Sequence, residues 1–331
     1  MELRQLGRTG IRVTEACLGA MTFGRETEEA DSRAILDRYL GAGGNFIDTA
    51  NVYNAGASEE ILGRALGARR DTVVLATKCR MPMGGGPNQK GASRRVIREQ
   101  VEASLRRLQT EWIDLYQIHC WDAHTPLEET LSTLNDLVRE GKVRYIGASN
   151  YTGWQLATAL GVSREHGWEP YISIQPQYSL VCRDIERELL PLAEYTGLAV
   201  LPWSPLGGGL LSGKYQPGEA PAADTRAADT TPSAVLMRMR IQQERNFAVA
   251  QAVHDLAAEL GKTMAQVALN WVLHRPGVTA PILGARTVAQ IDDNLGAIGW
   301  QLDADALARL EDASAIARGY PYDFIDWIHA R

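Results

Sequence analysis

The sequence is poor in cysteine and has no long hydrophobic run. Its four cysteines, Cys17, Cys79, Cys120 and Cys182, lie far apart and form no CxxC pair. That spacing excludes the common zinc and dithiol motifs, and we expect no metal site. No stretch approaches the roughly 18 uninterrupted apolar residues of a membrane span, and the first residues lack the apolar run of a signal peptide. These absences predict a cytoplasmic protein with no membrane partner.

Basic residues are also in the minority. The chain has 34 Lys and Arg against 40 Asp and Glu, which gives a formal net charge of −6. Proteins that bind nucleic acid usually carry a basic total or a basic patch, so we expect no nucleic-acid partner. A length of 331 residues allows either two domains or one α/β barrel. Assembly into a homo-oligomer is also compatible with the sequence.

Short apolar runs alternate with segments of helical periodicity along most of the chain. The predicted strands are 16–19, 45–48, 73–78, 113–119, 143–148, 172–177, 199–203 and 279–283. The predicted helices between and after them include 28–42, 59–66, 94–108, 127–140, 154–165, 185–196 and 288–298. Alternating strands and helices predict a parallel sheet, and eight such units favour a closed (β/α)8 TIM barrel over an open sheet.

Several segments lie outside this alternation. A hairpin is predicted at the N-terminus, from two short runs that flank a Gly-Arg-Thr-Gly turn at 7–10. Residues 216–233 are rich in Ala, Pro, Asp and Thr without an apolar face, which predicts a mobile loop. Extra helices are expected at 247–260, 264–274 and 304–317, before an aromatic C-terminus. We expect residues 1–331 to form a single barrel domain.

Polar residues close three neighbouring predicted strands. Asp48 ends the second strand, Lys78 the third and His119 the fourth, and Tyr53 follows Asp48 by five residues. In such a barrel the active site lies at the C-terminal ends of the strands. A free phenol is too weak an acid for neutral pH, but a lysine ammonium beside it favours phenolate, and Asp48 would keep Lys78 charged. A histidine can donate a hydrogen bond to a carbonyl oxygen. The set predicts proton delivery to an alkoxide-like oxygen.

Each of these residues also has an ordinary structural interpretation, as a turn, a cap or a solvated side chain. Only their joint position at consecutive strand ends favours catalysis. A barrel hydrolase would need two acidic groups at strand ends, and only Asp48 is clearly there. The segment 208–214 fits GxxxxGK, but Tyr215 stands where a P-loop needs Ser or Thr.

Longer motifs resemble the aldo-keto reductase superfamily, in its bacterial and plant-type branch. They are FIDTANVY at 46–53 with SEEILG at 58–63, GKVRYIGASN at 141–150, and ILGART at 282–287. The resemblance covers nearly the whole chain. It implies a (β/α)8 barrel that reduces an aldehyde or ketone with a nicotinamide cofactor, reversibly. The family's catalytic tetrad corresponds to Asp48, Tyr53, Lys78 and His119, with Tyr53 as proton donor.

The resemblance also implies a cofactor site. Trp203 would stack on the nicotinamide, Ser149, Asn150 and Gln175 would bind its carboxamide, and Ser204, Leu206 and Gly207 would line the pyrophosphate. The motif that contains Gly284 and Arg286, with Gln290 and Asn294, would hold the adenosine part. Because an arginine can pair with a 2′-phosphate, NADPH is favoured over NADH.

The substrate is the least defined part of the prediction. Side chains expected beside the rim are Met21, Phe23, Asn54, Trp121 and Tyr178. Their aromatic and apolar character favours a fairly hydrophobic aldehyde, ketone or sugar-like carbonyl. An alternative is a cofactor-binding regulatory subunit, like the potassium-channel β-subunits that share this barrel.

Overall fold

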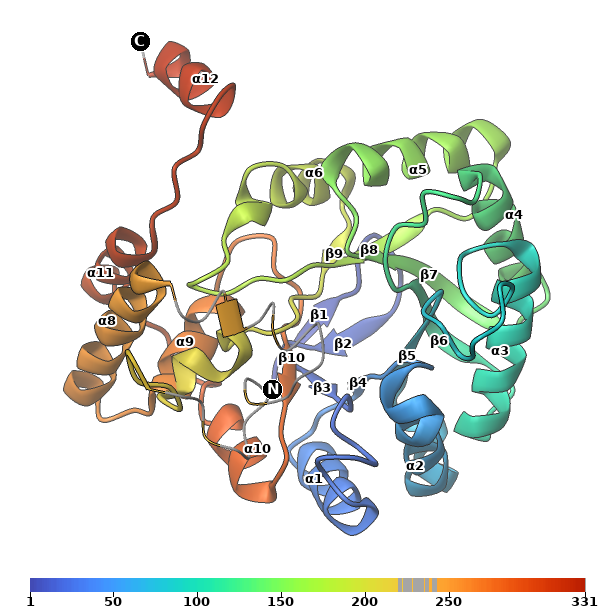
Figure 1. Cartoon of the computed structure of the whole chain (residues 1–331), viewed down its shortest axis with the longest axis horizontal. Coiled ribbons are helices and arrows are strands. Elements are labelled where there is room, and N and C mark those ends of the chain that lie inside the picture. Colours follow the sequence, from blue (N-terminus) through green and yellow to red (C-terminus); the bar gives the residue numbers. More distant parts are fainter. Residues whose placement is uncertain (220–221, 223–227, 229–234, 236–237, 240–242, 331) are drawn as a thin grey trace.

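The computed structural model describes residues 1–219, 222, 228, 235, 238–239 and 243–330. Within these residues the main sheet has eight parallel strands (Figure 1). They are β3 (Cys17–Gly19), β4 (Phe46–Asp48), β5 (Val74–Cys79), β6 (Ile113–Ile118), β7 (Val143–Ser149), β8 (Tyr171–Gln175), β9 (Ala199–Val200) and β10 (Ile282–Gly284). Neighbours pair in chain order from β3 to β9, and β10 pairs with β3.

The ring of strands is closed between β9 and β10. A parallel bridge joins Val200 to Val278, and the Ile282 amide donates to the Pro202 carbonyl at 2.8 Å. The protein therefore folds as a (β/α)8 barrel, as the alternation predicts. All the strand C-termini consequently meet at one rim.

Helices surround the barrel in the order of the chain (Figure 1). They are α1 (Glu29–Gly41), α2 (Ala57–Leu66), α3 (Arg94–Leu108), α4 (Leu127–Arg139), α5 (Gly153–His166), α6 (Leu189–Thr196) and α10 (Val288–Leu295). The further helices α8 (Glu244–Leu260), α9 (Met264–Leu273) and α11 (Ala304–Ser314) confirm the predicted extra helical material. Helix α12 (Tyr322–His329) was not predicted and lies in the aromatic C-terminal segment, beyond the helix that was expected to be the last. Short 3-10 turns are η1 (Tyr53–Gly56), η2 (Gly67–Thr72), η3 (Asp184–Glu186) and η4 (Gly207–Ser212).

Helix α3 shows why these segments form helices. Ser93 caps its N-terminus by accepting a hydrogen bond from the Val96 amide at 3.4 Å. Its apolar stripe faces the strands and is buried: Val96, Ile97, Val101, Leu105 and Leu108. Each such side chain contributes roughly 1.5–3 kcal/mol on burial. The predicted bounds, 94–108, are those observed.

One predicted helix is wrong in its bounds. The segment 185–196 divides into η3 and α6, because Glu188 adopts φ −135° and ends the helical backbone between them. The predicted loop at 216–233 lies largely outside the described residues.

The N-terminal hairpin seals one end of the barrel. It consists of β1 (Leu3–Gln5) and β2 (Arg12–Thr14), which pair antiparallel. Leu6 and Val13 beside these strands are fully buried, and they join the apolar cluster inside the barrel: Cys17, Phe46, Val74, Ala76, Leu115, Ala199, Leu201 and Ala280. The barrel interior is thus filled at the hairpin end, which leaves the rim as its open end.

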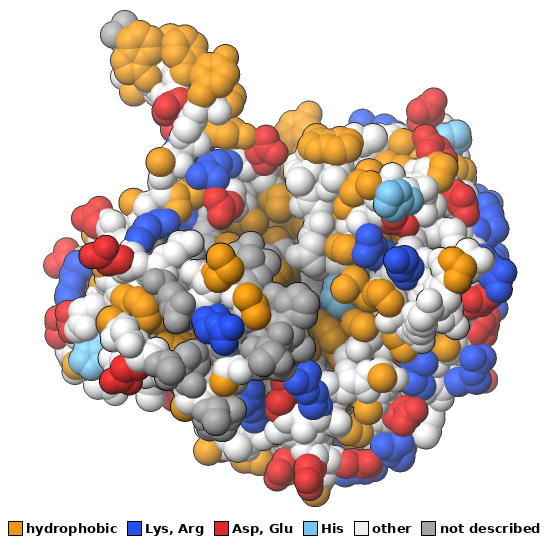
Figure 2. Space-filling model, viewed as in Figure 1, with side chains coloured by type: hydrophobic (Ala, Val, Ile, Leu, Met, Phe, Trp, Pro, Cys, Tyr) orange, Lys and Arg blue, Asp and Glu red, His pale blue; other side chains and the backbone are white. Residues whose placement is uncertain are grey.

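The last helix stands apart from the rest. No residue of α12 is buried, and Figure 1 shows it projecting from the body at the end of an extended segment. Its hydrophobic side chains gather at the tip of this projection in Figure 2. In the described part of the chain, no helix is both long enough and apolar enough to cross a membrane.

Candidate active site

Four predicted catalytic residues meet at the open rim. Asp48 is the last residue of β4, Lys78 lies near the end of β5, and His119 follows β6 directly. Register aligns Asp48 with Ala76 and Lys78 with Gln117, so these strand ends are neighbours. Tyr53 begins η1, in the loop after β4. The face in Figure 2 is hollowed near its centre with hydrophobic side chains around the hollow, as the open end of a barrel would be.

The Lys78 ammonium connects three groups of the site. Its Nζ donates to the Asp48 carboxylate, to the Thr49 carbonyl oxygen at 2.8 Å and to the Tyr53 hydroxyl at 3.2 Å. Lys78 is fully buried. Burial is the largest single effect and lowers the pKa of this lysine, but the charge interactions and hydrogen bonds with Asp48 and Tyr53 together outweigh burial, and the net pKa is raised. Lys78 therefore stays protonated, and all three ammonium protons have acceptors.

Asp48 is held by two amide side chains. Its second carboxylate oxygen accepts from Gln117 Nε2 at 3.1 Å and from Gln175 Nε2 at 2.8 Å. The Gln175 amide nitrogen also lies 3.3 Å from the Gln117 side-chain oxygen. Gln117 was missed by the sequence reasoning. The available signal was an amide side chain in β6, two residues before His119.

His119 is electrically neutral in this site. Its ring packs edge-on against Tyr53, with ring centroids 5.7 Å apart. Desolvation, together with the positive charges of Lys78 and Arg80, lowers the pKa of His119 from 6.5 to about 3. At neutral pH this histidine can donate or accept a hydrogen bond, but it cannot serve as the acid that supplies a proton.

The turn that carries Tyr53 is strained and tightly held. Asn54 and Ala55 have φ of 52° and 55°, values that residues other than glycine rarely adopt. The side-chain amide of Asn54 donates from Nδ2 to the carbonyl oxygens of Met21 at 3.1 Å and Phe23 at 2.6 Å. Asn54 thus ties the Tyr53 turn to the loop after β3, which is a positioning role.

The predicted substrate residues divide into accessible and buried ones. Met21 is exposed, and Trp121 is partly buried in edge contacts with Tyr151 and Trp154. Phe23 and Tyr178 have no exposed surface. The Tyr178 hydroxyl instead donates to Glu186 at 2.5 Å, and its ring packs on Trp271. Contact of Phe23 and Tyr178 with a substrate stays a prediction, and in this structure both side chains are packed inside the protein.

A polar chain links the tetrad to the predicted nicotinamide residues. Asn150, with φ 55°, donates from its amide to the His119 carbonyl oxygen at 2.9 Å and to Ser149 Oγ at 2.9 Å. Trp203 Nε1 donates to Asn150 Oδ1 at 3.1 Å. A partly exposed indole therefore stands beside amide groups at the rim, and this combination fits a flat ring that carries a carboxamide.

The comparison with known families decides the assignment. The model of the Aldo/keto reductase family matches residues 15–315. The chain belongs to this family.

Relatives cover nearly all of the chain. It is 43% identical to the uncharacterized oxidoreductase YrpG of Bacillus subtilis, over 94% of this chain and 95% of that protein. It is 35% identical to the norsolorinic acid reductase stcV of Emericella nidulans, over 96% and 82%. A probable voltage-gated potassium channel subunit beta of Oryza sativa is 37% identical, over 90% and 91%. This aldo/keto reductase is therefore an oxidoreductase of carbonyl compounds, in a family that generally uses nicotinamide cofactors.

The other predicted cofactor residues of this aldo/keto reductase lie in two loops at the rim. After β9, Ser204 accepts from the Gly208 amide at 2.9 Å, and the Gly207 amide donates to the Ser204 carbonyl at 2.9 Å. A pyrophosphate near Ser204, Leu206 and Gly207 would compete with these bonds. After β10, Gln290 accepts from the Arg286 amide at 2.8 Å, and Asn294 donates to the Gly284 carbonyl at 3.0 Å. These contacts bring Arg286 next to the N-terminus of α10, where an anion is favoured.

Proposed function

We propose that this aldo/keto reductase reduces an aldehyde or ketone to an alcohol with NADPH, and that Tyr53 supplies the proton. The observation that carries the proposal is the pair of hydrogen bonds from Lys78 Nζ, one to Asp48 and one to the Tyr53 hydroxyl. A charged ammonium 3.2 Å from a phenol stabilises the phenolate that remains when the proton leaves.

Each residue of the tetrad has a distinct role in this proposal. Asp48 keeps Lys78 charged and is itself oriented by Gln117 and Gln175. Tyr53 gives its hydroxyl proton to the carbonyl oxygen. His119, neutral at working pH, donates a hydrogen bond that orients that oxygen. In the reverse direction the Tyr53 phenolate takes the proton from an alcohol.

The cofactor would supply a hydride to the carbonyl carbon. We propose that Trp203 stacks on its nicotinamide ring. The carboxamide would be bound by Asn150, Ser149 and the side-chain carbonyl oxygen of Gln175. Both amide protons of Gln175 are already directed to Asp48 and Gln117. Arg286, beside the α10 N-terminus, would bind the 2′-phosphate, which favours NADPH over NADH.

The test is Tyr53→Phe, which removes one oxygen from the site. We expect kcat for reduction of a neutral aldehyde to fall at least about 100-fold, because general acid catalysis contributes that much. Loss of NADPH absorbance measures the rate, and NADH in parallel measures the cofactor preference. Gly161→Ala, at an α5 position where a Cβ meets open space, is the matched control and should keep its rate. Equal rates in Tyr53→Phe and wild type would refute the proton-donor role.

The second candidate is a regulatory subunit that binds the cofactor without turnover. Its support is the likeness to the rice potassium channel subunit beta. The hydrogen-bonded tetrad favours the enzyme. Absence of turnover across a panel of carbonyls, with retained cofactor binding, would favour the subunit.

A further inference from the structure

Arg80 is a cation at the rim to which the proposed reaction gives no role. It follows β5 directly, two residues after Lys78, and is partly buried. The His119 amide donates to the Cys79 carbonyl at 3.1 Å, so the backbone on either side of Arg80 and His119 is in contact. The Arg80 charge is close enough to lower the pKa of His119 and that of Asp122. Arg80 thus lies beside the reacting groups.

The backbone of Arg80 is held in a conformation that suits glycine. Its φ is 95°. The Gln100 side chain accepts from the Arg80 amide at 2.8 Å and donates to the Met81 carbonyl at 3.1 Å, and the Gly91 amide donates to the Arg80 carbonyl at 2.9 Å. Gln100 is itself buried. These hydrogen bonds hold the Arg80 backbone in its strained conformation. Strained conformations that are held in this way are typical of functional residues.

Positive φ elsewhere in the described chain supports this interpretation. Six residues other than glycine have it: Asn54, Ala55, Arg80, Gln109, Asn150 and Ser204. Gln109 ends α3, a usual place for this conformation. The other five follow the C-terminal ends of barrel strands, where the proposed site lies.

The Arg80 guanidinium differs from the buried arginines of the protein. Arg70, Arg107 and Arg183 pair with Asp114 at 2.7 Å, Glu59 at 2.7 Å and Glu186 at 2.9 Å, respectively. Within the described residues no carboxylate lies at salt-bridge distance from Arg80, and its Nη1 meets the Met81 sulfur at 3.9 Å. Its Nε is buried without a hydrogen-bond partner in the described structure. A buried donor of this kind is costly unless something binds it.

The nearest acid does not pair with Arg80, because its oxygens are used elsewhere. The Asp122 carboxylate accepts from the Ala92 amide at 2.8 Å, the His124 amide at 3.1 Å and the Thr125 hydroxyl at 2.8 Å. The Asp122 carboxylate therefore joins the loop after β5, through Ala92, to its own loop, through His124 and Thr125. An anion for Arg80 must come from outside the described chain.

We infer that Arg80 binds an anionic group of the carbonyl substrate, which makes the substrate an aldehyde or ketone that carries a carboxylate or a phosphate. The Nε and Nη atoms of a guanidinium form a fork that matches two oxygens of such a group. Arg80 would hold that group while the carbonyl lies at Tyr53. This inference rests on the proposed reduction and adds a charge to the predicted hydrophobic substrate.

The test compares two aldehydes of nearly equal shape, 4-formylbenzoate and its neutral amide, 4-formylbenzamide. Wild type should prefer the carboxylate by at least about tenfold in kcat/KM, because a charge-assisted fork is worth about one to two powers of ten. Arg80→Gln should lose about 10- to 100-fold on the carboxylate, mainly through KM, and less than about threefold on the amide. Arg80→Lys should lie between. Arg106→Gln, an exposed arginine at the end of α3, is the matched control for net charge.

A second pair identifies the anion. Glyceraldehyde 3-phosphate against glyceraldehyde asks the same question of a phosphate, and an Arg80-dependent preference in either pair supports the inference. If Arg80→Gln changes kcat/KM equally for both members of both pairs, or for no member, the inference is wrong.

The two proposals fail in different ways. If wild type reduces neither aldehyde, or Tyr53→Phe reduces the neutral one at the wild-type rate, the proposed reaction is wrong. Binding of 4-formylbenzoate, measured without turnover, then still tests whether Arg80 binds the anionic group. A Kd at least about tenfold weaker in Arg80→Gln supports the inference, and an equal Kd overturns it.

Discussion

At the scale of single residues, His119 links catalysis to pH stability. Its pKa is about 3 in the folded protein, because burial and two neighbouring cations oppose its charge, against 6.5 for a free histidine. The unfolded chain therefore binds a proton between these values that the folded chain does not. The free energy of unfolding consequently decreases as pH falls from 6.5, at up to about 1.4 kcal/mol per pH unit.

We predict that His119→Gln reduces this acid sensitivity. Between pH 6.5 and 4.5 the wild type should lose about 2 kcal/mol more of unfolding free energy than the variant, which has no titrating group at this position. Urea unfolding at both pH values measures the difference. His166→Gln, at an exposed histidine at the end of α5, is the control. An acid loss identical in wild type and His119→Gln would contradict the assigned pKa shift.

The proximity of the four tetrad residues was predictable because three of them lie at consecutive strand ends and Tyr53 follows Asp48 by five residues. The supporting residues were not. Gln117 lies within β6 and contacts Asp48 only once two strands pair, and the role of Asn54 depends on carbonyls 31 and 33 residues away in the chain. Tyr178 lies just beyond β8, near the rim in sequence terms, yet the packing of Trp271 buries it. Side-chain direction after a strand end depends on tertiary packing, which periodicity does not report.

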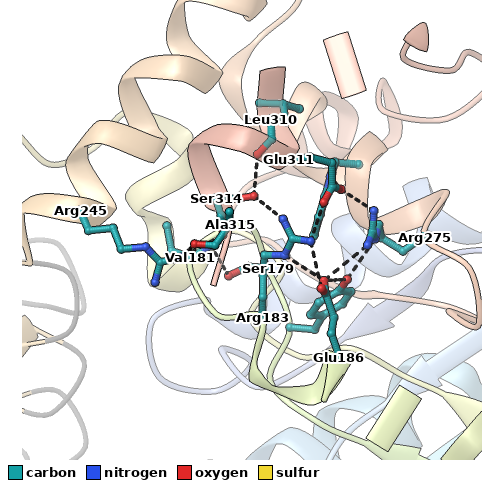
Figure 3. A network of polar contacts seen from close by, with 12 residues as sticks. Ser179, Val181, Arg183, Glu186, Arg245, Arg275, Leu310, Glu311, Ser314 and Ala315 are labelled. Carbon is teal, nitrogen blue, oxygen red and sulfur yellow. Dashed lines mark hydrogen bonds and ion pairs between the residues drawn. The ribbon is translucent and has the colours of Figure 1, made fainter. Parts of the chain in front are cut away.

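At the scale of elements, an ion network attaches the last helices to the loop after β8 (Figure 3). Arg183 donates to Glu186 at 2.9 Å and to Glu311 of α11 at 2.5 Å, and Arg275 after α9 pairs with Glu311 as well. Both guanidinium groups also pack over the Trp271 ring. The loop they hold contains Tyr178, whose amide donates to the Trp203 carbonyl at 3.3 Å. The network thus supports the residue proposed to stack on the cofactor.

Glu311→Gln should destabilise the protein by about 2 kcal/mol, because two partly buried arginines lose a counter-charge. Denaturant unfolding measures the loss. The control, Glu259→Gln, breaks an exposed pair with Arg309 that joins α8 to α11, and it should change stability by less than about 0.5 kcal/mol. Equal effects of the two substitutions would show that the network contributes no more than a surface pair.

The barrel strands were predictable because each is a short buried run between helices of clear periodicity. Their bounds differ from the predicted ones by a few residues, as for β9, which ends at Val200 rather than at 203. Leu201 and Pro202 are buried like strand residues, but Pro202 has no amide to donate to a ladder. The division of 185–196 into two elements depends on backbone geometry at Glu188 that its composition does not indicate.

At the scale of the whole molecule, the C-terminal projection is separable from the barrel. Helix α12 has no buried residue, and Phe324 is 55% exposed. Its contacts with the body include the hydrogen bond that the Tyr322 hydroxyl donates to Glu188 at 2.6 Å. Burial, and not helix content, determines what a segment contributes to stability.

Truncation after Arg318 should therefore leave the melting temperature within about 2 °C of the full chain, since exposed surface changes stability little. Thermal unfolding followed by circular dichroism measures it. Leu310→Ala, in the fully buried face of the preceding α11, is the contrasting variant and should cost about 2–5 kcal/mol. A truncation that melts as early as Leu310→Ala would show that the projection stabilises the fold.

The hairpin that seals the barrel also sets an order on biosynthesis. Strands β1 and β2 leave the ribosome before the barrel strands, but the apolar cluster they cover includes Ala280, almost at the end of the barrel. Arg4 donates to the carbonyl oxygens of Leu273 and Thr279 at 3.0 and 3.1 Å, which do not exist until most of the chain is translated. Leu6 and Val13 must therefore stay solvated through nearly all of synthesis. The hairpin is made before the barrel but is among the last segments to reach its native place, and a nascent chain stalled before β10 presents this apolar pair to chaperones.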